Sequence, residues 1–521
     1  MKRTECIKKI GTEKEWDLAV IGGGASGLGV ALDAISRGLS VVLVEKADFA
    51  KGTSSRSTKL LHGGVRYLAQ GDIALVYEAL KERGLMMKNA PHVTGKQSFV
   101  IPIYSFWDRL KYGVGLKVYD LMAGRLRIGK STWISKKEVA DKIPTIKQKG
   151  LQGGVIYYDG QFDDARLAIN LAQTCTNLGG CILNYMGVVE LKKDEKGFLN
   201  GLKVKDQLNG KFYEINAKAV VNATGVFVDE ILRMDNPDAS KSIRPSQGAH
   251  LVLDISFLGG KDALMIPETS DGRVLFGIPW HGKLLVGTTD TLRKNPKIEP
   301  RALSKEIDFI LETCAGYLTK PPTREDVLAV FAGLRPLAAP KEKGAATKEI
   351  SRSHKVSITN SHLISIIGGK WTTFRRMGED TVDAIADLDL VKVLKSTSEN
   401  IKMHGFPNGR SMEGHMAIYG DDALSIKELM DDDPSLGLKL QPNFPNTKAE
   451  VVWMVRNEMA VKVEDVLARR MRILFLDAKA AIQMGPEVAK IMRAELDTDE
   501  EWEKNENKEF QEMAEKYLIT S

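Results

Sequence analysis

A glycine-rich turn near the start of the sequence constrains the fold of this chain more than any other feature. Residues 16–21, WDLAVI, form a short apolar run of the kind that becomes a buried strand. They are followed by residues 22–27, GGGASG, and then by a segment of helical character at 28–36. A G-x-G-x-x-G turn between a strand and a helix is typical of a dinucleotide-binding fold, and this is the fold that we predict.

Each position of this turn has an expected physical role. Gly22 makes the tight turn, Gly24 lets the backbone approach a pyrophosphate, and Gly27 lets the helix pack closely on the strand. Ala25 opens the helix, whose free N–H groups and positive dipole end attract phosphates. A second apolar strand ends at Glu45, 21 residues after Gly24, where a carboxylate can accept both ribose hydroxyls of an adenosine. The sequence therefore predicts a bound dinucleotide.

Two later segments favour FAD over NAD. Residues 218–225, KAVVNATG, form an apolar strand that ends in Ala223, Thr224 and Gly225, as in flavoproteins with two dinucleotide folds. Residues 363–370, LISIIGGK, form a buried-strand pattern that breaks into glycines before a helix. That helix N-terminus could face the pyrimidine end of an isoalloxazine and stabilise the anionic reduced flavin. Each segment alone is also compatible with an ordinary parallel strand, but together with the first turn they predict FAD.

The cysteines and the hydropathy pattern give no sign of export or of a metal. The four cysteines form no CxxC and no ligand cluster with the eight histidines, so we predict reduced thiols and no metal site. The first residues lack the apolar core of a signal peptide, and no uncharged stretch is long enough to span a bilayer. We expect no signal peptide and no transmembrane helix.

The net charge of +6 is unevenly distributed. Residues 495–521 hold ten acidic residues against three lysines, and we expect this tail to be solvated. Residues 105–130 hold six Lys/Arg against two Asp, interleaved with Trp107, Tyr112 and Tyr119. Such a pattern is typical of a helix in a membrane interface, although an amphipathic helical pair packed on its own domain is the alternative. Nucleic-acid binding is not expected, because no recognised fold motif accompanies the charge.

One segment carries a family resemblance. Residues 53–68, TSSRSTKLLHGGVRYL, strongly resemble the signature of FAD-dependent glycerol-3-phosphate dehydrogenases. Four further segments resemble the same family in the same order, covering about residues 17–378: FDDARL at 162–167, VGTTD at 286–290, GLRPL at 333–337 and GGKWTT at 368–373. The resemblance implies oxidation of sn-glycerol 3-phosphate to dihydroxyacetone phosphate by hydride transfer to flavin N5. It also implies that ubiquinone or menaquinone takes the electrons at a membrane surface.

The resemblance also implies the substrate site. Arg335 and Arg352 match the family's phosphate-binding arginines, whose guanidinium forks suit tetrahedral oxyanions. His62 is the best candidate base, because an imidazole titrates near neutrality. A histidine that is bonded to backbone and only shapes the flavin pocket is the competing interpretation of His62. The remaining implied groups are Arg66, Tyr67 and Thr289, which would face the substrate, and Lys370, which would stabilise a developing alkoxide or the reduced flavin.

Further residues are predicted to hold the cofactor. Thr53, Ser54 and Lys59 supply donors for the pyrophosphate and ribityl region, although a Ser/Thr cluster could equally be an N-cap and loop. Asp163 and Asp164 are interpreted as the N-cap and first turn of a helix rather than as catalytic carboxylates. The full predicted FAD set is Gly22, Gly24, Ala25, Gly27, Glu45, Lys46, Thr53, Ser54, Lys59, Leu60, Val188, Ala223, Thr224, Gly225, Gly369, Lys370 and Thr372.

The fold class that we predict is α/β (α+β), a flavoprotein with two dinucleotide folds. The FAD domain is expected at 14–104, 150–238 and 340–395, and an inserted antiparallel sheet that binds substrate at 239–339. Residues 105–149 would form the membrane-associating segment, and residues 400–521 a helical C-terminal domain with the acidic tail. The expected location is the cytoplasmic face of the inner membrane, bound peripherally, with a homodimer left open.

Three other functions compete. A glycerol-3-phosphate oxidase would pass the electrons to oxygen, but its relatives carry an inserted segment that this sequence lacks. An FAD-dependent amine or amino-acid oxidase would share the nucleotide motifs but has no reason for the segment around Arg335. A flavin-binding scaffold without activity would leave His62, Arg335 and Lys370 without a role.

Overall fold

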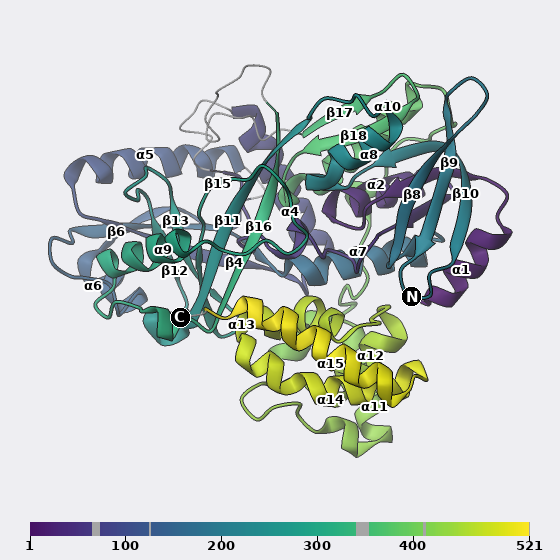
Figure 1. Cartoon of the computed structure of the whole chain (residues 1–521). Coiled ribbons are helices and arrows are strands. Elements are labelled where there is room, and N and C mark those ends of the chain that lie inside the picture. The colour runs from purple at the N-terminus through teal and green to yellow at the C-terminus, as the bar shows by residue number, and fades with distance from the viewer. Residues whose placement is uncertain (65–72, 124–126, 340–353, 410–412, 520–521) are drawn as a thin grey trace.

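The computed structural model describes residues 1–64, 73–123, 127–339, 354–409 and 413–519. Two sheets lie side by side, and a group of helices near the C-terminus packs below them (Figure 1). The long β-strands of the second sheet meet the first sheet along one boundary, where β16 contacts β18. This boundary is where the predicted site residues meet.

The first sheet is the dinucleotide-binding layer. Its main order is β17 (His354–Ile358), β18 (Leu363–Gly368), β10 (Phe212–Asn222), β1 (Trp16–Ile21), β2 (Val41–Val44) and β7 (Cys181–Leu183). The five strands from β18 to β7 run parallel and are largely buried where they pair with one another, as a sheet covered on both faces requires. The first residues of β10, which include the exposed Phe212, extend beyond this parallel part. β8 (Met186–Lys193) and β9 (Leu199–Asp206) form an antiparallel extension of β10.

The register of this sheet brings the glycine turns together. Ile21 lies opposite Asn222, and Asn222 lies opposite Ser365. The residues that follow β1, β10 and β18 therefore meet at the carboxyl edge of the sheet, where such folds bind ligands. Three packed helices follow β1, β6 and β18 along the chain: α2 (Ala25–Ser36), α7 (Asp164–Asn177) and α10 (Phe374–Ala386).

The second sheet is wider than predicted. Its strands from the expected region are β11 (Ile243–Asp254), β12 (Ala263–Ile266), β13 (Leu275–Trp280), β14 (Lys283–Gly287), β15 (Thr291–Leu292) and β16 (Ala329–Ala338). Four more come from earlier in the chain: β3 (Leu60–Leu61), β4 (Thr94–Ile103), β5 (Thr132–Ser135) and β6 (Gly153–Phe162). Parts of the ranges 14–104 and 150–238, which we predict for the FAD domain, therefore pair into the second sheet, because a strand pattern does not reveal which sheet the strand joins. The pairs are antiparallel except for β4 with β12.

Helices cover the second sheet on its outer side. α4 (Ile73–Asn89) and α5 (Phe106–Ala123) contact each other, and α5 lies along the outer edge of the molecule (Figure 1). The other helices before the C-terminal domain are α1 (Arg3–Thr12), α6 (Lys136–Lys142), α8 (Val228–Asp235) and α9 (Ser304–Tyr317). Among the described residues, no helix is both long and apolar enough to cross a bilayer.

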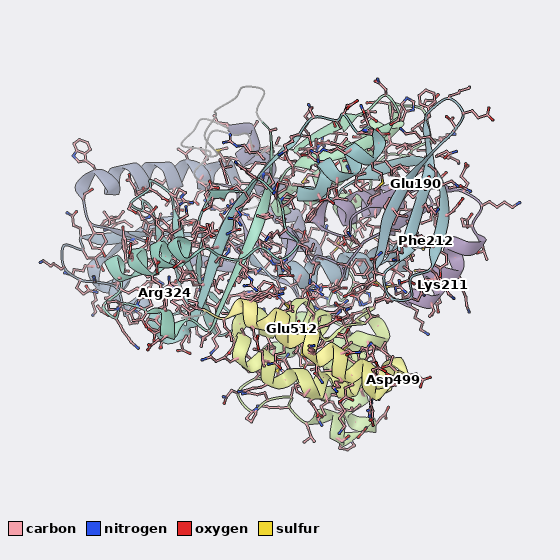
Figure 2. The ribbon with its side chains drawn as sticks, in the orientation of Figure 1. Glu190, Lys211, Phe212, Arg324, Asp499 and Glu512 are labelled. Atoms are coloured by element: carbon pink, nitrogen blue, oxygen red, sulfur yellow. The ribbon has the colours of Figure 1, made fainter. Side chains whose placement is uncertain are left out.

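The C-terminal residues form a helical domain whose core continues into the second sheet through Val252, Leu285 and Phe331. Its helices are α11 (Asp422–Asp432), α12 (Lys448–Asn457), α13 (Ile473–Leu476), α14 (Ala478–Leu496) and α15 (Glu500–Ala514), with a π-helical turn at Asp465–Arg470. The acidic tail is not simply solvated. It folds as α15 against α14, with Phe510, Met513 and Tyr517 buried and Asp499 and Glu512 among its acidic residues (Figure 2). An apolar stripe hidden in an acidic sequence explains the difference.

Candidate active site

One cavity of about 1140 Å³ gathers most of the predicted residues. It lies between the carboxyl edge of the first sheet and strands of the second sheet, and it is larger than the usual pocket for a single small molecule. The predicted residues that line it are Gly22, Gly24, Ala25, Glu45, Lys46, Thr53, Ser54, Leu60, His62, Val188, Ala223, Thr224, Gly225, Thr289, Arg335, Gly369, Lys370 and Thr372. Arg66, Tyr67 and Arg352 lie outside the described residues.

The first glycine turn is built for close approach. Gly22 has φ of +110°, and a Cβ there would lie 2.7 Å from the Ala223 carbonyl oxygen. A Cβ on Gly24 would lie 3.0 Å from Ser54 Oγ, and one on Gly27 only 1.9 Å from the Gly22 oxygen. Ser54 Oγ accepts the Ala25 N–H at 2.9 Å, so the loop after β2 touches the start of α2. Glycine is favoured at these positions because backbone atoms, or Ser54 in the case of Gly24, occupy the space that a Cβ would need.

Glu45 sits at the end of β2 as predicted. Its carboxylate accepts the Gly23 N–H at 2.7 Å and the Ala47 N–H at 2.8 Å. Burial raises the pKa of Glu45, while these two amide donors oppose that rise. With its two oxygens held by backbone amides, the carboxylate is fixed at the cavity wall beside the glycine turn.

The third glycine segment closes the opposite part of the cavity. Gly368 and Gly369 have φ of +81° and +84°, which turns the chain from β18 to Lys370. The next residue, Trp371, donates its indole N–H to the Ser54 carbonyl at 2.8 Å. Thr53 Oγ1 donates to the Leu334 carbonyl at 2.6 Å. Segments more than 250 residues apart in the sequence thus fix one another around the cavity.

Arg335 reaches the cavity from β16. Its Nη2 donates to Thr288 Oγ1 at 3.1 Å and to the Thr289 carbonyl at 3.1 Å, and its Nη1 lies 3.7 Å from Asp290 Oδ1. Gly248 on β11 makes the room, since a Cβ there would lie 2.5 Å from Arg335 Nη2. The guanidinium is therefore oriented before any ligand binds, which suits recognition of an oxyanion.

The structure changes the expected role of Thr289. Its hydroxyl accepts the Ala249 N–H at 2.9 Å and donates to Glu306 Oε1 at 2.9 Å, so it braces the strands. Thr288, which the sequence analysis missed, places its hydroxyl beside Arg335 instead. The sequence of two adjacent threonines does not show which hydroxyl faces a ligand, because that depends on how the backbone is oriented at this point.

Two imidazoles line the cavity. His62 follows β3 and is half-buried. His250 on β11 is buried, stacks on Phe331, and lies with Nε2 3.0 Å from Thr58 Oγ1. Burial, and then the nearby charges of Lys59 and Arg335, lower the pKa of His250 well below its ordinary value. His250 is therefore a neutral ring, and sequence analysis gave no reason to single it out.

Lys59 has a different position from the predicted one. Its ammonium is fully buried, is not among the groups lining the cavity, and donates to Asp164 Oδ2 at 2.6 Å and to the Ser55 carbonyl at 2.7 Å. Burial and the neighbouring Arg472 lower its pKa to about 7, against the opposing effect of Asp164. Lys59 thus stabilises the loop that carries Thr53 and Ser54, on the side of the loop that faces away from the cavity.

A buried ion cluster, consisting of Lys59, Asp163, Asp164 and Arg472, joins this loop to the C-terminal domain. Asp163 caps α7 as predicted, accepting the Arg166 N–H at 3.0 Å. Arg472 donates to Asp164 Oδ1 at 2.9 Å and to the Ser55 carbonyl at 3.0 Å. The two aspartates therefore do more than begin a helix, because they hold two buried cations under the cavity.

The described residues fit FAD. The glycine positions leave space where a Cβ would collide with backbone or with Ser54, and Gly24, Ala25 and Ser26 at the start of α2 line the cavity, so the positive end of this helix can attract a pyrophosphate. Glu45, Lys46 and Val188 line the cavity beside this turn, and the Gly369 segment lines it farther along the sheet edge. A cavity with this length and this set of donors defines a dinucleotide-binding site.

Comparison with known proteins agrees with this geometry. The chain matches the FAD dependent oxidoreductase family over residues 17–373 and the C-terminal domain of alpha-glycerophosphate oxidase over residues 362–503. It is 38% identical to mitochondrial glycerol-3-phosphate dehydrogenase of Homo sapiens over 97% of this chain and 73% of the human protein. The crystal structure of glycerol-3-phosphate dehydrogenase from Bacillus halodurans, complexed with FAD, is 31% identical. It superposes with a TM-score of 0.78 over 99% of this chain and 98% of that one.

A more distant structure shares the fold alone. L-alpha-glycerophosphate oxidase from Mycoplasma pneumoniae is 16% identical, with a TM-score of 0.58 over 74% of this chain and 97% of that chain. The two sheets, the glycine turns and the cavity between them define the class of FAD-dependent oxidoreductases. Within that class, the chain belongs to the glycerol-3-phosphate dehydrogenase family. The predicted family, fold class and FAD cofactor are confirmed.

Proposed function

We propose that this protein oxidises sn-glycerol 3-phosphate to dihydroxyacetone phosphate and passes the electrons to a membrane quinone. The observation that carries the proposal is one cavity in which an oriented arginine, Arg335, and an imidazole, His62, join the flavin-binding glycine turns. A secondary alcohol that bears a phosphate needs a cation for the dianion and a base for the hydroxyl proton. The names of the relatives point to the same substrate.

The roles follow from position and chemistry. Arg335 and the Thr288 hydroxyl bind the phosphate, and His62 accepts the proton of the secondary hydroxyl. Lys370 stabilises the alkoxide as the proton leaves. FAD, when bound, supplies the hydride acceptor. The other sequence-based assignments, Arg66, Tyr67 and Arg352, stay proposals as substrate-facing groups.

An apolar wall of the cavity supports a quinone as the acceptor. Met265, Val274 and Phe276 line the cavity. Met265 belongs to a hydrophobic cluster that includes Leu116 on α5, and Val274, Phe276 and Tyr112 pack against this cluster. This wall leads from the site toward the outer helix rather than toward the C-terminal domain. A lipid-dissolved acceptor suits such a wall better than oxygen, which needs no apolar contact.

One experiment tests the proposal and separates its rivals. Anaerobic addition of sn-glycerol 3-phosphate should bleach the 450 nm absorbance of the FAD-loaded protein, whereas glycine and proline should not. Menadione should then restore the yellow colour much faster than oxygen. Absence of bleaching would remove the proposed substrate, and faster reoxidation by oxygen would favour an oxidase. His62→Ala should bleach at least tenfold more slowly with FAD still bound, because general base catalysis contributes about 10²–10⁴-fold.

Peripheral binding to the cytoplasmic face of the inner membrane is proposed from the outer face of α5. Trp107 and Leu121 are 75% and 80% exposed, and Ile73 and Tyr77 at the start of α4 are also exposed. On the inner side of α5, Leu116 and Tyr119 are buried, so one stripe of the helix packs on the domain while the stripe with Trp107 and Leu121 is exposed. Exposed aromatic and aliphatic side chains next to Lys117 suit an anionic lipid surface.

Replacing Trp107 and Leu121 together with glutamate should weaken binding to vesicles containing phosphatidylglycerol at least tenfold. The change removes two inserting side chains and adds two charges that anionic lipid repels. Cosedimentation of the protein with the vesicles measures the binding. Phe212→Glu is the control, because Phe212 is also exposed but lies on β10 at the other side of the molecule (Figure 2). Equal binding of the double variant and the control would contradict the assignment of this surface.

A further inference from the structure

A tyrosine from helix α5 holds the backbone next to His62. Tyr119 is 1% exposed, and its hydroxyl accepts the Gly63 N–H at 2.8 Å. The contact is close enough that a Cβ on Gly63 would lie 2.6 Å from the Tyr119 oxygen and 2.6 Å from Leu80 Cδ2. Helices α4 and α5 thus close directly on the segment that carries the proposed base.

The direction of this hydrogen bond is fixed by a buried carboxylate. The Tyr119 hydroxyl donates to Asp159 Oδ2 at 2.8 Å, and Arg83 Nη1 donates to Asp159 Oδ1 at 2.8 Å. All three side chains are buried. Burial raises the pKa of Tyr119 well above its ordinary value, so the hydroxyl keeps the proton that it gives to Asp159. Its lone pair then accepts the Gly63 N–H.

We propose that Tyr119 is a positioning residue that acts through His62. The peptide between residues 62 and 63 sets the direction of the His62 side chain, and Tyr119 fixes the plane of that peptide through the Gly63 N–H. A displacement of about 1 Å at a reacting group can cost about a hundredfold in rate. The inference rests on the proposed role of His62 as base, but the contact itself is independent of that role.

Tyr119→Phe should slow flavin reduction by sn-glycerol 3-phosphate about tenfold in anaerobic stopped flow, because the Gly63 N–H loses its acceptor. The apparent Kd for the substrate should change less than twofold, since Arg335 and Thr288 lie on other elements. Tyr104→Phe is the matched control. The Tyr104 hydroxyl also contacts backbone, donating to the Lys147 carbonyl at 3.2 Å, but Tyr104 is not among the residues that line the cavity.

A double-mutant cycle separates positioning from general loosening. If Tyr119 acts through His62, Tyr119→Phe should slow reduction less than twofold in a His62→Ala background. Val76→Ala serves as a packing control, because Val76 belongs to the same small cluster as Tyr119 but makes none of its hydrogen bonds. A tenfold loss in both backgrounds, or the same loss for Val76→Ala, would overturn the inference.

Hydrogen exchange gives a measurement that does not depend on turnover. In the FAD-loaded protein without substrate, the peptide covering residues 60–64 should exchange its Gly63 amide faster in Tyr119→Phe than in the wild type. Unchanged protection would overturn the inference even if the reaction is as proposed. If wild-type flavin is not reduced by sn-glycerol 3-phosphate, the proposed function fails, and exchange still decides whether Tyr119 holds this peptide.

Discussion

Replacing Arg335 with alanine should lower kcat/KM for sn-glycerol 3-phosphate about a thousandfold while FAD stays bound. Truncating one partner of a desolvated charge pair costs about 2–5 kcal/mol, and each 1.4 kcal/mol is a factor of ten. The loss should be this large because Thr288 and Thr289 hold the guanidinium in place, so the variant loses both the charge and its fixed orientation. Steady-state oxidation with a dye acceptor measures the change, and the absorbance at 450 nm measures the bound flavin.

Two comparisons make the Arg335 prediction specific. Arg335→Lys keeps the charge but not the planar fork, so its loss should be intermediate. Arg324→Ala should change kcat/KM less than twofold, because Arg324 is also paired with an aspartate, Asp308 at 2.6 Å, but lies on the surface (Figure 2). Unphosphorylated glycerol, a far poorer substrate, should be oxidised equally by wild type and Arg335→Ala. A similar loss of kcat/KM for both substrates would mean that Arg335 does not bind the phosphate.

Replacing Arg472 with methionine should destabilise the protein by about 3–5 kcal/mol, because two buried carboxylates, those of Asp163 and Asp164, lose one of their cationic partners. Arg472 is buried, contacts both Asp163 and Asp164, and lies over the rings of Phe475 and Trp280. Asp164 also bonds Ser57, just after the Thr53–Ser55 turn. Loss of the Arg472 contact should therefore also loosen the loop that carries Thr53 and Ser54. Urea denaturation followed by the fluorescence of released FAD measures the effect.

The pH dependence of the Arg472 effect has a defined sign. Although burial raises the pKa of Asp163, Arg472 and then His281 hold it below its ordinary value. The stabilisation is therefore present above the unfolded pKa of about 4 and is lost as pH falls through the lower folded value. Without Arg472, burial dominates and Asp163 takes up a proton more readily. The deficit of the variant should thus be largest near pH 7 and shrink toward pH 4.

A matched control comes from the same domain. Arg493→Met removes an arginine of α14 that is partly exposed and lies 3.2 Å from Glu503. Surface pairs of this kind contribute about 0–1 kcal/mol, so this variant should unfold close to the wild type. If Arg472→Met and Arg493→Met unfold at the same urea concentration, the ion cluster does not join the loop that carries Thr53 and Ser54 to the C-terminal domain.

Local patterns in the sequence predict the flavin side of the molecule well. The turn at residues 22–27 and the strands before Ala223 and Gly368 have the predicted places, because glycine spacing and apolar runs report local geometry. The pairing of β4 and β6 into the second sheet is not predicted, for the opposite reason. Phe99 of β4 lies opposite Ala263 of β12, 164 residues later, and nothing in a strand's own pattern names its partner.

The residues of the candidate site also fall into those that local sequence patterns predict and those that depend on contacts between distant segments. The family signature at residues 53–68 marks Lys59 as important, but only the packed structure reveals that its ammonium turns away from the cavity to Asp164. Thr288 and His250 are missed because they depend on contacts between separate strands. Tyr119 is hidden in a segment whose charge suggests a membrane, since no local sign connects α5 with Gly63.

The first sheet also sets an order of events during synthesis. β1 pairs with β2 nearby in the chain, but its other edge pairs with β10, Trp16 opposite Ala217. At about 5–20 residues per second, a ribosome needs roughly 10–40 s to make the intervening 200 residues. Throughout that time β1 presents unpaired backbone groups on an apolar strand, which is a template for aggregation. The glycine turn is therefore made early, but the strand before it pairs with β10 only late in synthesis. The nascent chain is most prone to aggregation just before β10 completes the first sheet.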